Sequence, residues 1–238
     1  MSTPFTKISG SARQRLGGRI VLAVGMGALM LLGLAYWWLE NLAHELFGTA
    51  LFLLLARHIY QNRSWFRNIV KGRYGLRRTV IVTFHAALAL NMAALLATSL
   101  AISQSLFAAL PRPDSAVLTE IHWFSAYWAV IAIGCHVGLH WPRIRAITSA
   151  ALDLPPATPA QTRLLTLLAV VLVAIGISSL SALDVQTKLS FELSPNFWDF
   201  STSVTPFFVR WTGVLALPAI ATHCAMNIIP RLRTRSKL

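Results

Sequence analysis

Long apolar runs dominate the chain and alternate with short segments rich in basic residues. Each run is about 20 residues long, which is the length a helix needs to cross the hydrocarbon core of a bilayer. The six runs cover residues 19–39, 41–59, 79–100, 118–141, 164–183 and 207–229. This pattern predicts an all-α membrane protein with six transmembrane helices.

The charges lie unevenly on the two sides of these runs. Of the 21 lysines and arginines, all but Arg112, Lys188 and Arg210 lie before or at the start of the first run, after the last run, or at and between the adjoining ends of runs two and three and of runs four and five. Seven of the eight acidic residues lie on the opposite side, and Asp153 is the exception. Because lysine and arginine are enriched in cytoplasmic loops, we predict that both termini are cytoplasmic.

Composition supports a lipid-facing chain. Hydrophobic residues make up 55% of the sequence and charged residues 12%, about half the charged share of a soluble domain. The net charge of +13 is accounted for by the cytoplasmic loops, so we expect contact with membrane lipid and no nucleic-acid partner. A proline-rich linker near residues 153–159 divides the chain into a four-helix part, residues 1–150, and two further helices, residues 151–238.

The spacing of four histidines is the most informative feature. His44 and His58 lie 14 residues apart in the second run, and His122 and His136 lie 14 apart in the fourth. On a helix, 14 residues place two side chains about 40° apart on one face and about 21 Å apart along the axis. Ionisable groups inside membrane helices are costly and usually functional.

Runs two and four cross the membrane in the same direction, so the histidines form an outer pair, His44 and His122, and an inner pair, His58 and His136. Two axial imidazoles on opposite sides of a haem fill the iron coordination and favour electron transfer over oxygen chemistry. We therefore predict two non-covalent b-type haems with these four iron ligands, and no Cys-x-x-Cys-His motif for covalent attachment exists.

His140 is an alternative inner ligand. It lies 18 residues from His122, a whole number of turns, but pairing it with the second run leaves a mismatch of about 6 Å. The interval therefore favours His136. His140 is left as a candidate for binding a haem propionate, a quinone or the lipid headgroups, with an interfacial residue beside Trp141 and Pro142 as the alternative. His85 and His223 are expected to be packing residues, with an additional site or a quinone pocket as the alternative. Gly134 and Gly138 indicate close helix packing.

No other chemistry competes in the sequence. Nucleotide-binding, metalloprotease and hydrolase motifs are missing, and no acidic residue lies in the middle of a run, as a transporter would usually need. We expect an electron-transfer subunit of an oxidoreductase system, without a substrate pocket of its own. The alternative is a haem-free membrane anchor that docks a partner protein through its loops.

Two stretches carry a resemblance to a known family. They are His44-Glu45-Leu46-Phe47-Gly48, Arg57-His58, Asn62-Arg63-Ser64-Trp65-Phe66 and Lys71-Gly72-Arg73-Tyr74 in the first, and Ile121-His122-Trp123-Phe124-Ser125-Ala126-Tyr127-Trp128 with His136-Val137-Gly138-Leu139-His140-Trp141 in the second. Together they resemble the flavinylation-associated cytochrome family of cytochrome b-like membrane domains. The resemblance covers roughly residues 20–147.

The resemblance implies a four-helix haem-binding bundle that moves electrons across a prokaryotic inner membrane. The family pattern matches His44, His58, His122, His136 and His140, and leaves open whether His136 or His140 is the inner ligand. It also implies a partner with covalently attached flavin, which would be a separate polypeptide here. A quinol or a cytoplasmic protein is the expected donor, and the direction of electron flow stays open.

Overall fold

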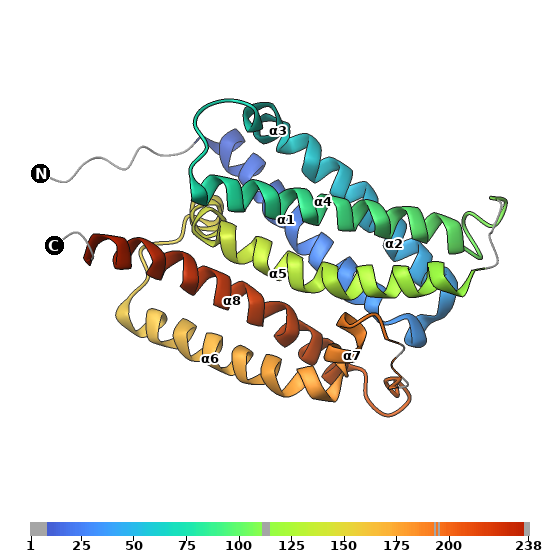
Figure 1. The fold of residues 1–238 in the computed structure, drawn as a ribbon. Coiled ribbons are helices and arrows are strands. Elements are labelled where there is room, and N and C mark those ends of the chain that lie inside the picture. Colours follow the sequence, from blue (N-terminus) through green and yellow to red (C-terminus); the bar gives the residue numbers. More distant parts are fainter. Residues whose placement is uncertain (1–8, 111–114, 193, 195, 236–238) are drawn as a thin grey trace, which may run out of the picture.

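The structure is a computed structural model that describes residues 9–110, 115–192, 194 and 196–235, with side chains described up to residue 228. These residues form helices and no strand (Figure 1). The helices are α1 (Gly10–Leu34), α2 (Tyr36–Gln61), α3 (Arg63–Ile69), α4 (Leu76–Ile102), α5 (Ala116–Leu152), α6 (Pro159–Ala182), α7 (Val185–Leu189) and α8 (Thr205–Arg235).

Six of these helices, α1, α2, α4, α5, α6 and α8, are long and apolar enough to cross a membrane. The prediction of an all-α protein with six spans is confirmed. Their outward faces carry large apolar side chains, and Val21, Leu53 and Leu90 are each about 70% exposed. Such a surface is suited to lipid and costly in water, so the chain is a multi-pass membrane protein.

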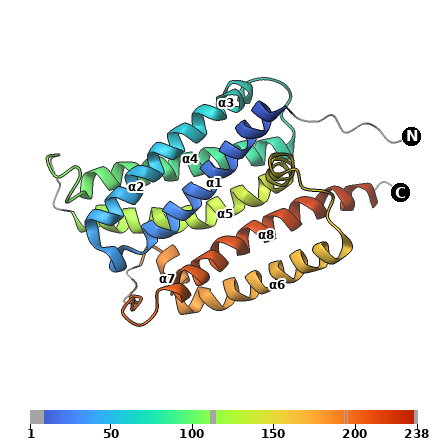
Figure 2. The ribbon, with the colours of Figure 1, turned by 180° about the vertical axis from the view of Figure 1, so that it is seen from behind.

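The helices lie roughly alongside one another, with both termini at one end of the molecule (Figures 1 and 2). Helices α2 and α5 run in the same direction, and α1 and α4 run in the opposite one. Helix α1 packs on α2 and α5, α4 packs on α5, and α8 packs on both α5 and α6. Helices α2 and α5 do not pack closely along their lengths, whereas α1 packs on both of them. The short helices α3 and α7 lie at opposite ends.

The first helix ends earlier than the sequence predicted. Helix α1 stops at Leu34, because the chain turns at buried Ala35 and residues 36–39 already belong to α2. Glu40 then interrupts α2 with a φ of 62°, a conformation that non-glycine residues rarely adopt. The predicted boundary between the first two runs, residue 40, is therefore a real break in the helix, although the turn itself lies five residues before it.

The fourth predicted run ends at residue 141, but α5 continues through Pro142 to Leu152. A proline removes one backbone hydrogen bond without always ending a helix, and here the helix simply extends beyond the apolar run. It stops at Asp153, which has a left-handed backbone conformation. The carboxylate of Asp153 pairs with Arg13 at 2.8 Å, which joins the end of α5 to the start of α1.

Close packing of α5 against α8 depends on two glycines. Gly134 and Gly138 are buried in α5, and a Cβ atom at either position would overlap a carbonyl oxygen of α8, that of Leu215 or of Ala219. Small residues allow membrane helices to approach this closely and gain van der Waals contact. The interpretation of these glycines as packing residues is confirmed.

Replacing Gly138 with alanine should destabilise the protein. Overpacking of this kind typically costs about 1–3 kcal/mol, so the thermal unfolding midpoint of Gly138→Ala in detergent should fall. Gly27→Ala is the matched control, because a Cβ atom there meets nothing within 4 Å and alanine favours the helix. Equal midpoints for the two variants would contradict the packing argument.

Candidate functional site

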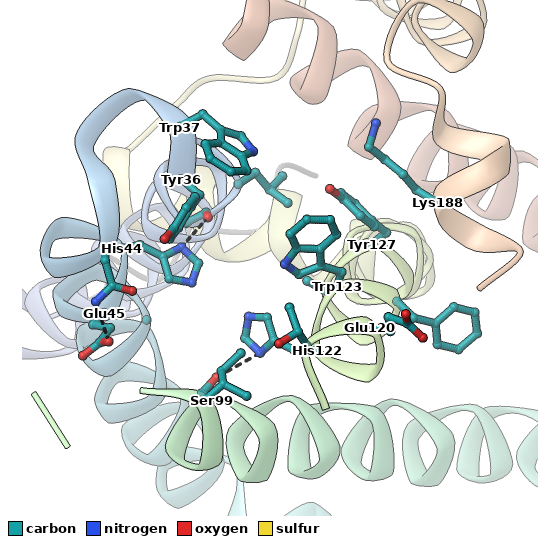
Figure 3. A pocket seen from close by; sticks show the side chains of 18 of the residues that line it. Tyr36, Trp37, His44, Glu45, Ser99, Glu120, His122, Trp123, Tyr127 and Lys188 are labelled. Carbon is teal, nitrogen blue, oxygen red and sulfur yellow. Dashed lines mark hydrogen bonds between the residues drawn. The ribbon is translucent and has the colours of Figure 1, made fainter. Parts of the chain in front are cut away.

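The outer histidine pair lies in a cavity between α2 and α5. His44 projects from α2 and His122 from α5, and their ring centroids are 6.0 Å apart with the planes at 70° (Figure 3). The cavity has a volume of about 570 Å³, within the usual range for cofactor pockets. His122 is only 8% exposed. The fold thus brings two imidazoles together from separate helices.

Hydrogen bonds orient both outer rings. The Nδ1 atom of His44 lies 2.8 Å from the carbonyl oxygen of Gly33, so this nitrogen donates its proton. The Nδ1 atom of His122 lies 3.3 Å from the hydroxyl of Thr98, whose own proton goes to the carbonyl of Ala94. Metal-binding histidines are usually oriented in this way, with the second ring nitrogen left free to bind the metal. Both Nε2 atoms lack a hydrogen-bond partner in the described part of the chain.

The inner end of the bundle holds four histidines. His58 of α2 faces His136 of α5 with ring centroids 6.3 Å apart and planes at 72°. The ring of His136 also lies 5.1 Å from that of His85 and 4.7 Å from that of His140. The Nδ1 atom of His136 is buried and has no hydrogen-bond partner among the residues that the structure describes. We call His58, His85, His136 and His140 the inner cluster.

Both opposed pairs have the separation that axial ligation requires. Metal–imidazole bonds are about 2.0–2.1 Å long, so two imidazoles on opposite sides of one iron have ring centroids about 6 Å apart. The outer pair, at 6.0 Å, and the inner pair of His58 and His136, at 6.3 Å, agree with this value. The donor set therefore fits two haems, and the cavity at the outer pair offers space for one of them.

His140 and His85 contact one another instead of facing His58. Their Nε2 atoms are 3.1 Å apart, and the Nδ1 atom of His85 donates to the carbonyl oxygen of Ile81. The ring-to-ring contact of His58 is with His136. This arrangement agrees with the preference for His136 from the residue interval, while the ligand role of either residue stays a prediction.

His85 belongs to the inner cluster, which sequence reasoning did not expect. Runs three and four are consecutive and antiparallel, so their inner ends lie at the same side of the membrane. This shared position could have linked His85 to His140 from the sequence. The ligand atoms of His85, His136 and His140 lie within 4.8 Å of one another, close enough to hold a metal ion. His223 lies apart from the cluster and contacts Asn227 and Trp141.

Glu45 holds the outer end of the site together, and the sequence did not indicate this role. Its carboxylate accepts hydrogen bonds from the side chains of Asn41 and Ser103, both at 2.8 Å. It also accepts hydrogen bonds from the backbone N–H groups of residues 104–106. One side chain of α2, the residue next to His44, therefore fixes the segment that follows α4.

Comparisons with protein-family models, curated proteins and solved structures find no match to the chain. We therefore infer the function from the geometry of the histidines and from the resemblance of the two sequence stretches.

Glu45→Gln should loosen the segment after α4. The amide replaces a charged oxygen with an N–H group that faces other donors, so the hydrogen bonds to the backbone of residues 104–106 should weaken. Hydrogen exchange at the amides of residues 104–106 should be faster in the variant. The matched control is Glu120→Gln, the same substitution at another acid that lines the cavity. Unchanged exchange in Glu45→Gln would show that these hydrogen bonds do not hold the segment.

Proposed function

We propose that the chain carries electrons across a membrane through two b-type haems, an outer one bound by His44 and His122 and an inner one bound by His58 and His136. The observation that carries this proposal is the separation of both opposed imidazole pairs, 6.0 and 6.3 Å. The two pairs are about 21 Å apart along the helices, which is most of the hydrocarbon thickness of about 30 Å.

Bound haem would supply reversible one-electron chemistry at iron, with no open coordination position. The chain's own residues position and insulate that chemistry. The carbonyl of Gly33 and the hydroxyl of Thr98 hold the rings of His44 and His122 with Nε2 toward the cavity. Tyr36 packs edge-on against His44 at 5.3 Å, and aromatic side chains of this kind help to exclude water from the site.

The wider physiological setting is part of the same proposal. The basic segments favour cytoplasmic termini, and the family resemblance favours a prokaryotic inner membrane. A quinol or a cytoplasmic protein would deliver electrons, and a separate flavoprotein would accept them on the outer side. The inner cluster, with its extra histidines His85 and His140, is the place where a quinone would meet polar groups near the cytoplasmic end.

The purified protein should show the absorption bands of b-type haem in a reduced-minus-oxidised spectrum, with two haems per chain by pyridine haemochrome assay. A colourless preparation from haem-sufficient cells would instead support a haem-free membrane anchor.

Redox titration should resolve two one-electron transitions, because the two pairs have different surroundings.

Single histidine substitutions should remove one haem at a time. His122→Ala should leave one haem per chain, and the remaining haem should have the potential of the inner site. His136→Ala should also leave one haem per chain, and that haem should have the potential of the outer site. His223→Ala is the matched control and should keep both haems, since His223 lies outside the inner cluster. Loss of a haem in His140→Ala, with both retained in His136→Ala, would move the inner ligand to His140.

A further inference from the structure

The cavity of the outer pair extends to α7, which supplies a lysine to its wall. Four charged side chains line the cavity, and three of them are acidic: Glu45, Glu120 and Glu192. Lys188 is the one cation among the described residues that line it. Figure 3 shows Lys188 beside Tyr127, on the side of the cavity away from Glu45.

Among the described residues, the Lys188 ammonium donates hydrogen bonds to neutral groups. Its ammonium donates to the carbonyl oxygen of Leu183 at 2.6 Å and to the hydroxyl of Ser194 at 3.3 Å, and it lies 5.7 Å from the ring centroid of Tyr127. In the described part of the chain no carboxylate lies within 4 Å of it. The nearby carboxylate of Asp184 instead accepts hydrogen bonds from Thr187 and Ser194.

This arrangement leaves a half-buried positive charge that no described carboxylate contacts directly, and Asp184 is linked to it only through the hydroxyl of Ser194. Burial lowers the pKa of the Lys188 ammonium, and the carboxylate of Asp184 opposes this only in part. A buried charge is costly unless it is paired, so an anion in the cavity beside Lys188 would be stabilised. Carboxylates bound by an ammonium form strong, charge-assisted hydrogen bonds.

We propose that Lys188 binds a propionate of the outer haem. This inference rests on the proposed function, because the outer haem is its premise. A haem held between His44 and His122 has two carboxylates at one edge, and the three acidic side chains would repel them from the rest of the wall. Lys188 thus sets which way the haem edge points and stabilises the reduced iron, which carries one positive charge fewer.

The inference also assigns a role to the last part of the chain. Lys188 belongs to α7, between the two C-terminal spans, whereas His44 and His122 belong to the first four. Trp211 of α8 lines the same cavity and stacks on Tyr127 of α5 at 5.7 Å. The C-terminal helices would therefore complete the outer haem site.

The test is redox titration of Lys188→Met in two full-length single-haem backgrounds. His58→Ala retains the outer haem, and His44→Ala retains the inner one. In the first background the substitution should lower the midpoint potential by about 59 mV, the equivalent of a tenfold change in the ratio of reduced to oxidised haem for a one-electron couple. In the second the potential should not change. Lys188→Arg should restore the potential.

Two controls separate propionate binding from a general charge effect. Arg210→Met removes a positive charge from the same side of the membrane at a residue that does not line the cavity, and it should shift the outer potential much less. Haem dimethyl ester, which lacks the propionate charges, should bind the apo forms of wild type and Lys188→Met with equal affinity. Ordinary haem should bind the wild type more tightly.

The outcomes distinguish this inference from the proposed function. A wild-type protein without haem overturns both. A protein with two haems whose outer potential is the same in Lys188→Met, or falls equally in Arg210→Met, overturns the role of Lys188 alone. Loss of only the outer haem in Lys188→Met, with recovery in Lys188→Arg, supports it.

Discussion

The gap between α2 and α5 is the feature on which the rest of the structure depends. Membrane helices have no hydrophobic drive to associate and gain stability from close contact. Helix α5 makes such contact with α8 through Gly134 and Gly138, but toward α2 it presents imidazoles. In the proposed function, a flat apolar cofactor with two free coordination positions would supply van der Waals contacts to the side chains that line the outer cavity and would bind the Nε2 atoms of His44 and His122.

The two ends of this gap are built differently. At the outer end, hydrogen bonds to residues other than histidine orient the two rings: His44 bonds to Gly33, and His122 bonds to Thr98. At the inner end histidines contact histidines, and Nδ1 of His136 has no partner among the described residues. Iron ligands with a hydrogen-bonded second nitrogen are more basic and more rigidly held. The outer site is therefore the better-defined one, and the choice between His136 and His140 arises at the end where orientation comes from neighbouring imidazoles.

The sequence predicted those features that depend on one helix at a time. Run length identified six spans, and residue intervals placed His44 with His58, and His122 with His136, on shared faces. The boundary between the first two spans was predicted near residue 40, whereas the first helix ends at Leu34. Features that depend on neighbouring helices could not be predicted in this way. The turn at Ala35 reflects how α1 packs on α2, and the hydrogen bonds of Glu45 need the backbone after α4 to be close. His85 joins the inner cluster only because α4 packs against α5.

The linker after Asp153 divides the chain at one surface of the membrane only. There, the proline-rich segment separates α5 from α6, and the sequence reads as four spans followed by two. Across the membrane, the glycines of α5 bring α8 into close contact, and at the outer end Tyr127 stacks on Trp211. The outer cavity is lined from both sides of the linker. The shared cavity therefore ties the outer histidine pair to helices that the family resemblance does not cover.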